Sequence, residues 1–295
     1  MKVLVTGAGG LVGSAVARHC AAQAQEVIAF DHQRLDIAEL DSVRPVMSHV
    51  RPDVVINCAA WTDVDGCETD PEHARKANAR GPEVLASSCQ EVGALLITIS
   101  TDYVFDGRKV GFYTQEDQPN PISVYGQSKL EGEARAQRAH ARTIVVRSGY
   151  IFGAGGKNFL STFLVRARAG DTLKAISDMV GTPTYAPDLA RQLYQLAQVN
   201  RPGTYHVVNA GDGVSFEGFA RAALEIAGLD SSLLQSTTLA ELNRPAPRPR
   251  NSRLRCLLSQ EAGLDPMPSW QAALRLFVAE QSHRVSRMDA GAQPS

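Results

Sequence analysis

Two short stretches of the chain hold residues whose types and spacing suit proton transfer. Tyr125 and Lys129 lie one helical turn apart, so their side chains would project from the same face of a helix. A cation beside a phenol favours the phenolate form, and this lowers the pKa of the tyrosine from its usual value of about 10. Such a tyrosine can exchange a proton with a carbonyl or an alcohol. Residues 100–103 (Ser-Thr-Asp-Tyr) follow an apolar run and would add two hydroxyl groups at the end of a buried strand.

A glycine pattern at the N-terminus indicates what this tyrosine could act with. Gly7, Gly10 and Gly13 follow a short β-branched strand at residues 2–5 and lead into a helical stretch at residues 11–22. In a dinucleotide-binding turn the first glycine permits a tight turn, the second lets the backbone approach a pyrophosphate, and the third lets the helix pack close to the strand. The phosphates would lie on the free amides of the helix N-terminus. Glycine also serves tight turns without this role, but the position directly after a first strand favours nucleotide binding.

The second predicted strand ends at Asp31, where a dinucleotide fold faces the adenosine ribose. A carboxylate there favours the free 2′-hydroxyl of NADH, whereas the nearby Arg34 favours the 2′-phosphate of NADPH. Asp31 and Arg34, with His32 between them, are therefore compatible with NADPH or NADH, and they favour NADPH or use of both cofactors. The alternative is that these residues form a solvated loop of mixed charge without a role in binding. Asp36 could accept a hydrogen bond from the adenine amino group or could be the acid at the start of a helix.

Two further features follow the third predicted strand. The small side chains at residues 57–60 would let a cofactor lie against the backbone, or they serve close packing alone. The acidic run that holds Asp63, Asp65 and Glu68 lacks the ordered ligand spacing of a metal site, so we expect a surface loop there.

Composition excludes several classes of function. The chain has 295 residues and a formal net charge of −1, with charges of mixed sign, so nothing indicates a nucleic-acid partner or an anionic membrane surface. No run reaches the roughly 18 apolar residues of a membrane span, and the first apolar stretch leads into the glycine turn and does not resemble a secretory signal. The five cysteines form no Cys-x-x-Cys, which favours reduced thiols in a cytoplasmic protein over disulfides or zinc.

Strand-like and helix-like segments alternate along the first half of the chain, which predicts right-handed βαβ crossovers. We therefore expect an α/β fold, a Rossmann-like doubly wound parallel sheet, with a smaller C-terminal substrate-binding lobe over the carboxyl ends of the strands. Strands are expected at residues 2–5, 27–30, 54–58, 95–100, 143–147 and 205–208, and helices at 11–22, 41–49, 72–91, 125–140, 159–169, 186–199, 216–227 and 270–278. The expected domains are an NAD(P)-binding domain at 1–150 with returning segments near 178–210, the substrate lobe at 151–287, and a disordered tail at 288–295.

Three motifs together resemble the extended short-chain dehydrogenase/reductases. They are the glycine triplet, Ser-Thr-Asp-Tyr-Val-Phe-Asp-Gly at residues 100–107, and Tyr-Gly-x-Ser-Lys at residues 125–129. More narrowly, the strings at residues 51–57, 59–65, 100–105, 181–184 and 248–254 are similar to the dTDP-4-dehydrorhamnose reductase family. The resemblance extends to about Val278. The glycine and Tyr-x-x-x-Lys motifs occur across the superfamily, whereas Ser-Thr-Asp-Tyr-Val-Phe and the late Asn-Ser-Arg-Leu are far more specific.

The resemblance implies a role for individual residues. Thr101 would hydrogen-bond the C4 carbonyl of a ketosugar, Tyr125 would donate the proton to that oxygen as hydride arrives from the nicotinamide, and Lys129 would hold the nicotinamide ribose and keep the tyrosine acidic. Hydride addition builds an alkoxide, so donors that strengthen with the developing charge lower the barrier. The residues expected to bind the cofactor are Gly7, Gly10, Leu11, Val12, Gly13, Asp31, His32, Arg34, Asp36, Ile37, Ala59, Ala60, Thr62, Tyr125 and Lys129.

The substrate side carries more alternatives. The residues expected to contact the sugar or its diphosphate are Thr101, Asp102, Tyr103, Tyr150, Asn158 and Arg253. Tyr103 could instead be a packing aromatic side chain. Asn158 could lie in an ordinary connection between elements, and Arg253 could form a surface salt bridge.

The chain departs from the family pattern in two places. The family commonly has Arg-x-x-Trp after the fifth strand, and here Tyr150 stands in place of the tryptophan and could stack on a sugar with less apolar area. Some members bridge a dimer through magnesium held by glutamates, but residues 288–295 contain no glutamate, so we expect no metal ligand there. Both a monomer and a homodimer stay open.

The function implied is the reduction of dTDP-4-dehydro-L-rhamnose to dTDP-L-rhamnose by NADPH or NADH. Because of Tyr150, a reductase or epimerase of another nucleotide sugar is a second reading. A third is a non-catalytic regulatory subunit, similar to the one that associates with methionine adenosyltransferase. The intact set of Thr101, Tyr125 and Lys129 argues against the third reading.

Overall fold

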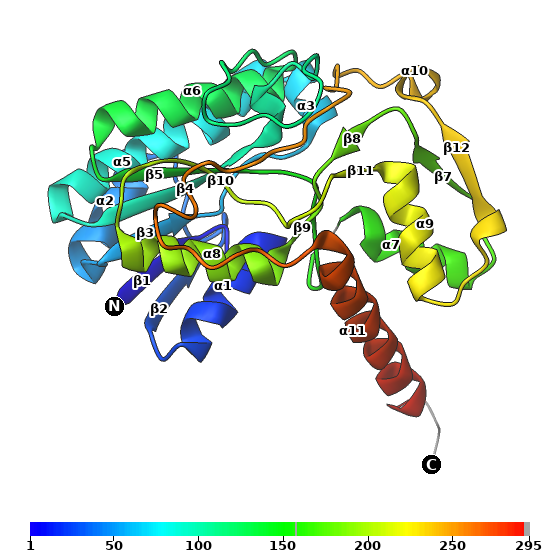
Figure 1. Cartoon of the computed structure of the whole chain (residues 1–295). Coiled ribbons are helices and arrows are strands. Elements are labelled where there is room, and N and C mark those ends of the chain that lie inside the picture. The colour runs from blue at the N-terminus through cyan, green and yellow to red at the C-terminus, as the bar shows by residue number, and fades with distance from the viewer. Residues whose placement is uncertain (157, 292–295) are drawn as a thin grey trace.

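A six-stranded parallel sheet forms the centre of the computed structural model, which describes residues 1–156 and 158–291, with side chains up to residue 282 (Figure 1). The strands are β1 (Lys2–Thr6), β2 (Glu26–Phe30), β3 (Val54–Asn57), β4 (Leu95–Thr101), β5 (Thr143–Ser148) and β10 (Gly203–His206). They lie in the order β10-β5-β4-β3-β1-β2, with parallel pairing throughout. This arrangement confirms the predicted doubly wound α/β fold.

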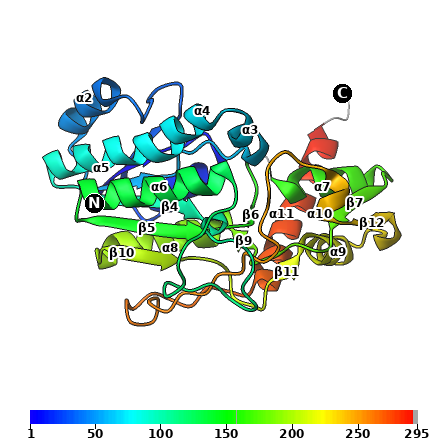
Figure 2. The same cartoon turned by 90° about the horizontal axis from the view of Figure 1, so that it is seen from above.

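Helices cover both faces of this sheet, as Figures 1 and 2 show. They are α1 (Leu11–Ala22), α2 (Leu40–Val50), α3 (Val64–Thr69), α4 (Pro71–Arg75), α5 (Gly81–Val92), α6 (Val124–Ala139) and α8 (Ala186–Val199). Side chains alternate between the faces of a strand, so Val3 and Val5 pack in the core beneath α1 and α8, while Leu4 packs in the core beneath α2 and α5. Strands buried on both faces read as continuous apolar runs, which is why the sequence revealed them.

The helix expected at residues 72–91 is interrupted, and the acidic run before it is helical. Helix α4 passes through a π-helical turn at Lys76–Arg80 into α5, which has a proline in its first turn. The expectation of a surface loop at the acidic run is wrong, because α3 forms there and Asp63 caps it by accepting from the Gly66 amide at 3.0 Å. Local capping by Asp63 stabilises a short helix that periodicity alone does not reveal.

A smaller lobe stands beside the carboxyl ends of the strands (Figure 1). Its elements are β6 (Ile151–Phe152), α7 (Phe159–Arg168), β7 (Leu173–Ile176), β8 (Val180–Gly181), β9 (Thr184–Tyr185), β11 (Val214–Ser215), α9 (Phe216–Ile226), β12 (Leu234–Thr237), α10 (Leu239–Leu242) and α11 (Trp270–Gly291). Ser269 caps α11 by accepting from the Ala272 amide at 3.2 Å. Helix α11 extends past residue 278 and includes residues 288–291, while residues 292–295 of the expected tail lie outside the described residues.

One late segment ties the two lobes together. Residues 244–256, here called the C-terminal strap, pair with β8 through the Ser252 amide, which donates to the Val180 carbonyl at 2.9 Å. The strap also contacts the lobe that contains the central sheet, because Arg248 forms two hydrogen bonds of 3.0 and 2.9 Å to the carboxylate of Asp65 on α3. Among the described helices, none has the length and apolar character needed to cross a bilayer.

Candidate active site

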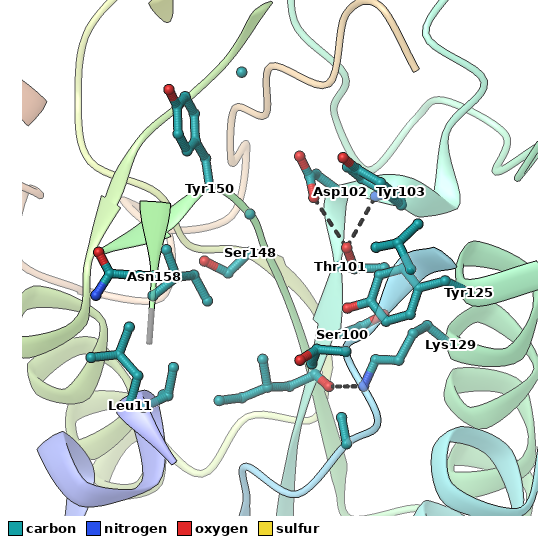
Figure 3. Close-up of a pocket in the computed structure, with 18 of the residues that line it drawn as sticks. Leu11, Ser100, Thr101, Asp102, Tyr103, Tyr125, Lys129, Ser148, Tyr150 and Asn158 are labelled. Carbon is teal, nitrogen blue, oxygen red and sulfur yellow. Dashed lines mark hydrogen bonds between the residues drawn. The ribbon is translucent and has the colours of Figure 1, made fainter. Parts of the chain in front are cut away.

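A cavity of about 580 Å³ opens at the carboxyl ends of the central strands, between the two lobes. Figure 3 shows side chains of β4 and α6 on one side of it and Leu11, Tyr150 and Asn158 on the other. Ligands of open α/β sheets bind at this edge, and the volume lies within the range of about 300–1,000 Å³ typical of small-molecule sites.

The glycine turn shapes the first wall of this cavity. Gly7 has a φ of +66°, and a Cβ at this position would lie 2.6 Å from the Ala59 amide nitrogen. A Cβ on Gly13 would lie 2.2 Å from the Gly7 carbonyl oxygen, so only glycine lets α1 pack this close to the turn.

The N-terminus of α1 is open to an anion. Its N-cap, Gly10, provides no side-chain hydrogen bond, and the first turn holds no acidic residue. Gly10, Leu11 and Val12 line the cavity, so their backbone amides can receive a phosphate group. The residues present therefore fit the pyrophosphate of a dinucleotide.

The residues expected near the adenosine ribose lie at the end of β2, outside the residues that line the cavity. Asp31 packs against Gly9 of the turn, and its Oδ1 accepts from the amides of Gln33 and Arg34 at 3.1 Å each. His32 and Arg34 are exposed, and the Arg34 guanidinium lies 5.1 Å from the centre of the Phe30 ring. An acid and an exposed cation thus lie together at the end of β2, where a dinucleotide fold faces the adenosine ribose.

The two residues that follow differ in environment. Asp36 is exposed, with an oxygen 3.6 Å from the Lys76 ammonium, and its other oxygen accepts from the Ala38 amide. Ile37 is buried and packs against Gly81. Its side chain belongs to the core, so only its backbone could meet an adenine.

The loop after β3 is held by a residue that sequence reasoning missed. Ala60 and Thr62 line the cavity, and Ala59 packs on Gly7. Asn78, on the π-helical turn, accepts from the Trp61 amide at 2.9 Å and donates to the Trp61 carbonyl at 3.0 Å. Single-turn π segments often occur at functional sites.

Close backbone approach brings the proposed catalytic side chains together. A Cβ on Gly126 would lie 2.2 Å from the Tyr103 carbonyl oxygen, so α6 packs directly on the turn that ends β4. Ser123 caps α6 by accepting from the Gly126 amide. Tyr125 therefore lies beside Thr101 in the cavity (Figure 3).

The environment of Tyr125 corrects one expectation. Burial raises the pKa of Tyr125 above its usual value, and the neighbouring Thr101 only partly offsets this. Lys129 does not lower it, because the ammonium donates to the Ile99 carbonyl at 2.7 Å instead (Figure 3). Tyr125 is therefore protonated at neutral pH, which is the form a proton donor needs.

Lys129 is buried and close to its titration point. Burial lowers the pKa of Lys129 to about 8, against the opposing effect of Glu133 one turn further along α6. Glu133 also forms a buried ion pair with Arg147, with a shortest distance of 2.7 Å, and accepts from the Ser100 hydroxyl at 2.5 Å. This network fixes the ends of β4 and β5 beneath the cavity.

The structure separates the expected substrate residues into groups. Thr101, Asp102, Tyr103, Tyr150 and Asn158 line the cavity, whereas Arg253 does not. The Arg253 guanidinium instead donates to the Asn251 side chain at 2.8 Å and to the Asp212 carbonyl at 3.3 Å. Ser252, one residue earlier in the same motif, lines the cavity together with Asp102.

Asn158 and Tyr103, which line the cavity, also make contacts that stabilise the fold. The Asn158 side chain caps α7, and its amide donates to the carbonyls of Gly153 and Gly156. Tyr103 packs edge-on against Tyr125, with ring centres 5.9 Å apart.

Tyr150 presents a different surface from a tryptophan. Its ring stacks on Phe216 at 3.9 Å between centres, and its φ of +49° is left-handed. Its hydroxyl is buried without a hydrogen-bond partner among the described residues. A buried hydroxyl without a partner costs about 1–3 kcal/mol, so a ligand that pairs with it binds favourably.

The described residues contain no group of three or more His, Cys, Asp or Glu side chains arranged to hold a metal ion. Part of the tail in which we expected no ligand lies outside these residues.

Comparison with known proteins assigns the family. Residues 1–283 match the family model described as RmlD substrate binding domain. The chain is 39% identical over 282 residues to a dTDP-4-dehydrorhamnose reductase of Mycolicibacterium smegmatis, covering 94% of this chain and 85% of that protein. It superposes with a TM-score of 0.91 on the dTDP-4-dehydrorhamnose reductases of Clostridium acetobutylicum (37% identity, 96% of this chain, 100% of that one) and of Bacillus anthracis in complex with NADP (33% identity, 95% and 100%). This chain therefore belongs to the dTDP-4-dehydrorhamnose reductase family.

Proposed function

We propose that this protein reduces the C4 ketone of dTDP-4-dehydro-L-rhamnose to give dTDP-L-rhamnose, with NADPH or NADH as hydride donor. The observation that carries the proposal is the single cavity in which Thr101, Tyr125 and Lys129 face the open N-terminus of α1. Membership of the family narrows the ketone to that of a nucleotide sugar.

The chain's own residues perform the proton chemistry. A bound nicotinamide would supply the hydride to C4. Tyr125 donates its phenolic proton to the oxygen that gains charge, and Thr101 holds the phenol in place. Lys129, which lines the same cavity, would hold the nicotinamide ribose. The cofactor phosphates would rest on the amides of Leu11 and Val12.

The cofactor choice follows from the end of β2. The Asp31 carboxylate and the exposed Arg34 guanidinium can each meet a ribose, so we propose use of both cofactors with NADPH preferred. The five free thiols fit a reducing cytoplasmic setting. We propose that the protein is a monomer or a homodimer.

NADPH and NADH oxidation with freshly prepared dTDP-4-dehydrorhamnose tests the proposal. We expect ketosugar-dependent oxidation with wild type and its near-complete loss in Tyr125→Phe, while NADPH still binds. Failure of wild type to oxidise either cofactor with this ketosugar would refute the substrate assignment.

A second candidate is the reduction of another nucleotide 4-keto-6-deoxysugar. The partnerless hydroxyl of Tyr150, where relatives commonly have tryptophan, favours a sugar with a polar group at that position. A panel of ketosugars assayed with wild type and Tyr150→Trp separates the two candidates. Wild-type preference for a different ketosugar, lost in Tyr150→Trp, would support the second.

A further inference from the structure

The carboxylate of Asp65 on α3 accepts hydrogen bonds from three residues of the C-terminal strap. The Arg248 guanidinium donates one N–H to each carboxylate oxygen, at 3.0 and 2.9 Å, and the Ala246 amide donates to Oδ1 at 3.1 Å. Arg244 adds a longer contact of 3.4 Å to Oδ2. The hydrogen bonds from Arg248 hold the pKa of Asp65 below its usual value, so the carboxylate is charged at neutral pH. A two-pronged contact of this kind is strong and fixes the orientation of both groups.

Both partners of this contact lie next to residues that line the cavity. Thr62 lies just before α3 and Val64 begins the helix, and both residues line the cavity. Four residues beyond Arg248, the strap places Ser252 in the cavity. In Figures 1 and 2 the strap leaves α10 and passes beside α3. The contact therefore joins a wall on the cofactor side of the cavity to the segment that carries Ser252.

The contact is better shielded from water than an otherwise similar pair on the surface. The side chains of Arg248 and Asp65 are 14% and 21% exposed, whereas those of Arg44 and Glu91 are 53% and 44% exposed. Exposed ion pairs contribute little, because water and salt screen them. Both pairs have two-pronged geometry, but Arg44 and Glu91 join α2 and α5 within one lobe. The pair on the strap is thus the one placed to hold the cavity walls together.

The later part of the strap has anchors of its own. The Ser252 amide donates to the Val180 carbonyl, and the Arg255 amide donates to the Tyr113 carbonyl, each at 2.9 Å. Loss of the carboxylate contact would therefore loosen the start of the strap and leave the later part paired. The expected consequence is a change in the shape of the cavity and not the unfolding of a lobe.

Building on the function proposed above, we propose that Asp65 is a positioning residue for the nucleotide sugar. By holding Arg248 against α3, Asp65 sets the separation between the strap and this helix and keeps Ser252 directed into the cavity. The pyrophosphate of the cofactor would bind to the amides at the N-terminus of α1, which this contact does not touch. Asp65 should therefore govern the affinity for the sugar and leave the affinity for NADPH unchanged.

Steady-state kinetics of Asp65→Asn test this role. Asparagine has nearly the same size but no charge, and its amide group cannot accept from Arg248. We expect KM for the ketosugar to rise by about tenfold or more, as for the loss of a hydrogen bond to a charged group, while kcat and the dissociation constant for NADPH stay within about threefold. An unchanged KM would overturn the proposal. Equal losses of affinity for the sugar and for NADPH would also overturn it, since they indicate a general disturbance of the fold.

Glu91→Gln is the matched control. It breaks the two-pronged pair with Arg44, which lies away from the residues that line the cavity. We expect this variant to keep the wild-type constants for both ligands. A rise of the ketosugar KM as large as in Asp65→Asn would show that any lost ion pair has this effect, and it would contradict the specific role of Asp65.

A double-mutant cycle with Arg248→Met gives a second readout. Because both substitutions break the same contact, the double variant should raise KM for the ketosugar no more than Arg248→Met alone. Additive increases would show that the two residues act independently and would overturn the proposal. Where Asp65→Asn is too unstable to assay, Arg248→Lys takes its place, since it keeps the charge but loses the fork. A wild-type KM in Arg248→Lys would then refute the positioning role.

Hydrogen exchange of the strap gives a readout that needs no substrate. The Ala246 amide donates to Asp65, so its exchange should be faster in Asp65→Asn and unchanged in Glu91→Gln. Equal exchange in all three proteins would contradict the tethering of the strap. A wild type without ketosugar-dependent oxidation would refute the proposed function, whereas an active wild type with the same KM as Asp65→Asn refutes only the role of Asp65.

Discussion

The two sides of the cavity are built in different ways. The cofactor side consists of the glycine turn and the first turn of α1, which are continuous in sequence and offer backbone amides. The catalytic side consists of Thr101 from β4, Tyr125 from α6 and Ser252 from the strap. These residues contribute side chains, and burial raises the pKa of Tyr125. Binding of an anion thus depends on backbone geometry, whereas proton transfer depends on desolvated side chains. Substitutions on the two sides should separate these properties.

The largest effect is expected on the catalytic side. Tyr125→Phe removes the proton donor, so kcat should fall by about 10²–10⁴-fold, the usual contribution of a general acid. The dissociation constant for NADPH, measured by fluorescence titration, should stay within about threefold, because the α1 amides are untouched. An equally large loss of NADPH affinity would abolish the distinction between the two sides.

The next effect is expected on the cofactor side. Gly13→Ala places a methyl group 2.2 Å from the Gly7 carbonyl, which forces α1 away from the turn. We expect NADPH affinity to fall by about tenfold or more, as misplaced binding groups lose their hydrogen bonds. Gly9→Ala is the matched control, since its Cβ would meet only the Asp31 side chain at 3.4 Å. Similar affinities for the two variants would show that the close approach of α1 is dispensable.

A smaller effect should follow the titration of Lys129. Burial places the pKa of Lys129 at about 8, below its usual value, so the cation is present below this pH and is lost above it. We therefore expect kcat/KM to decline as pH rises from about 8 to 9, up to tenfold per unit. Lys129→Met should have low activity and no such decline. A decline of the same shape in Lys129→Met would assign the titration to another group.

The smallest effect concerns the exposed end of the cofactor site. Arg34→Ala should raise KM for NADPH by a few fold, about what a surface charge contributes, and leave KM for NADH nearly unchanged. Arg138→Ala, an exposed arginine on α6, is the control. Equal KM changes for both cofactors would show that Arg34 does not read the 2′-phosphate.

The fold was predictable because its strands are apolar runs separated by helical periods. The interruption of the helix at Lys76–Arg80 was not predictable. The π turn there is stabilised by the hydrogen bonds of Asn78 with Trp61 and by the close packing of Gly132 on the Asn78 carbonyl. Those contacts join segments far apart in sequence. No local pattern encodes them.

The Asn-Ser-Arg-Leu motif at residues 251–254 is a second place where the sequence alone does not give the contacts, here within the candidate active site. The sequence indicates the right segment, and the charge of Arg253 favours that residue as the ligand contact, but the structure turns Ser252 into the cavity. Side chains of an extended chain alternate in direction, so pairing of the strap with β8 decides which neighbour faces inward.

The sequence by itself determined the residues that do chemistry, because spacing alone places Tyr125 and Lys129 on one helix face and the glycines in one turn. Only the tertiary structure decided where their protons and charges lie. Packing buries Tyr125, turns the Lys129 ammonium to the Ile99 carbonyl and encloses Asp102 beside Gly149. Desolvation depends on everything that surrounds a group, and those surroundings come from segments that meet only in the folded chain.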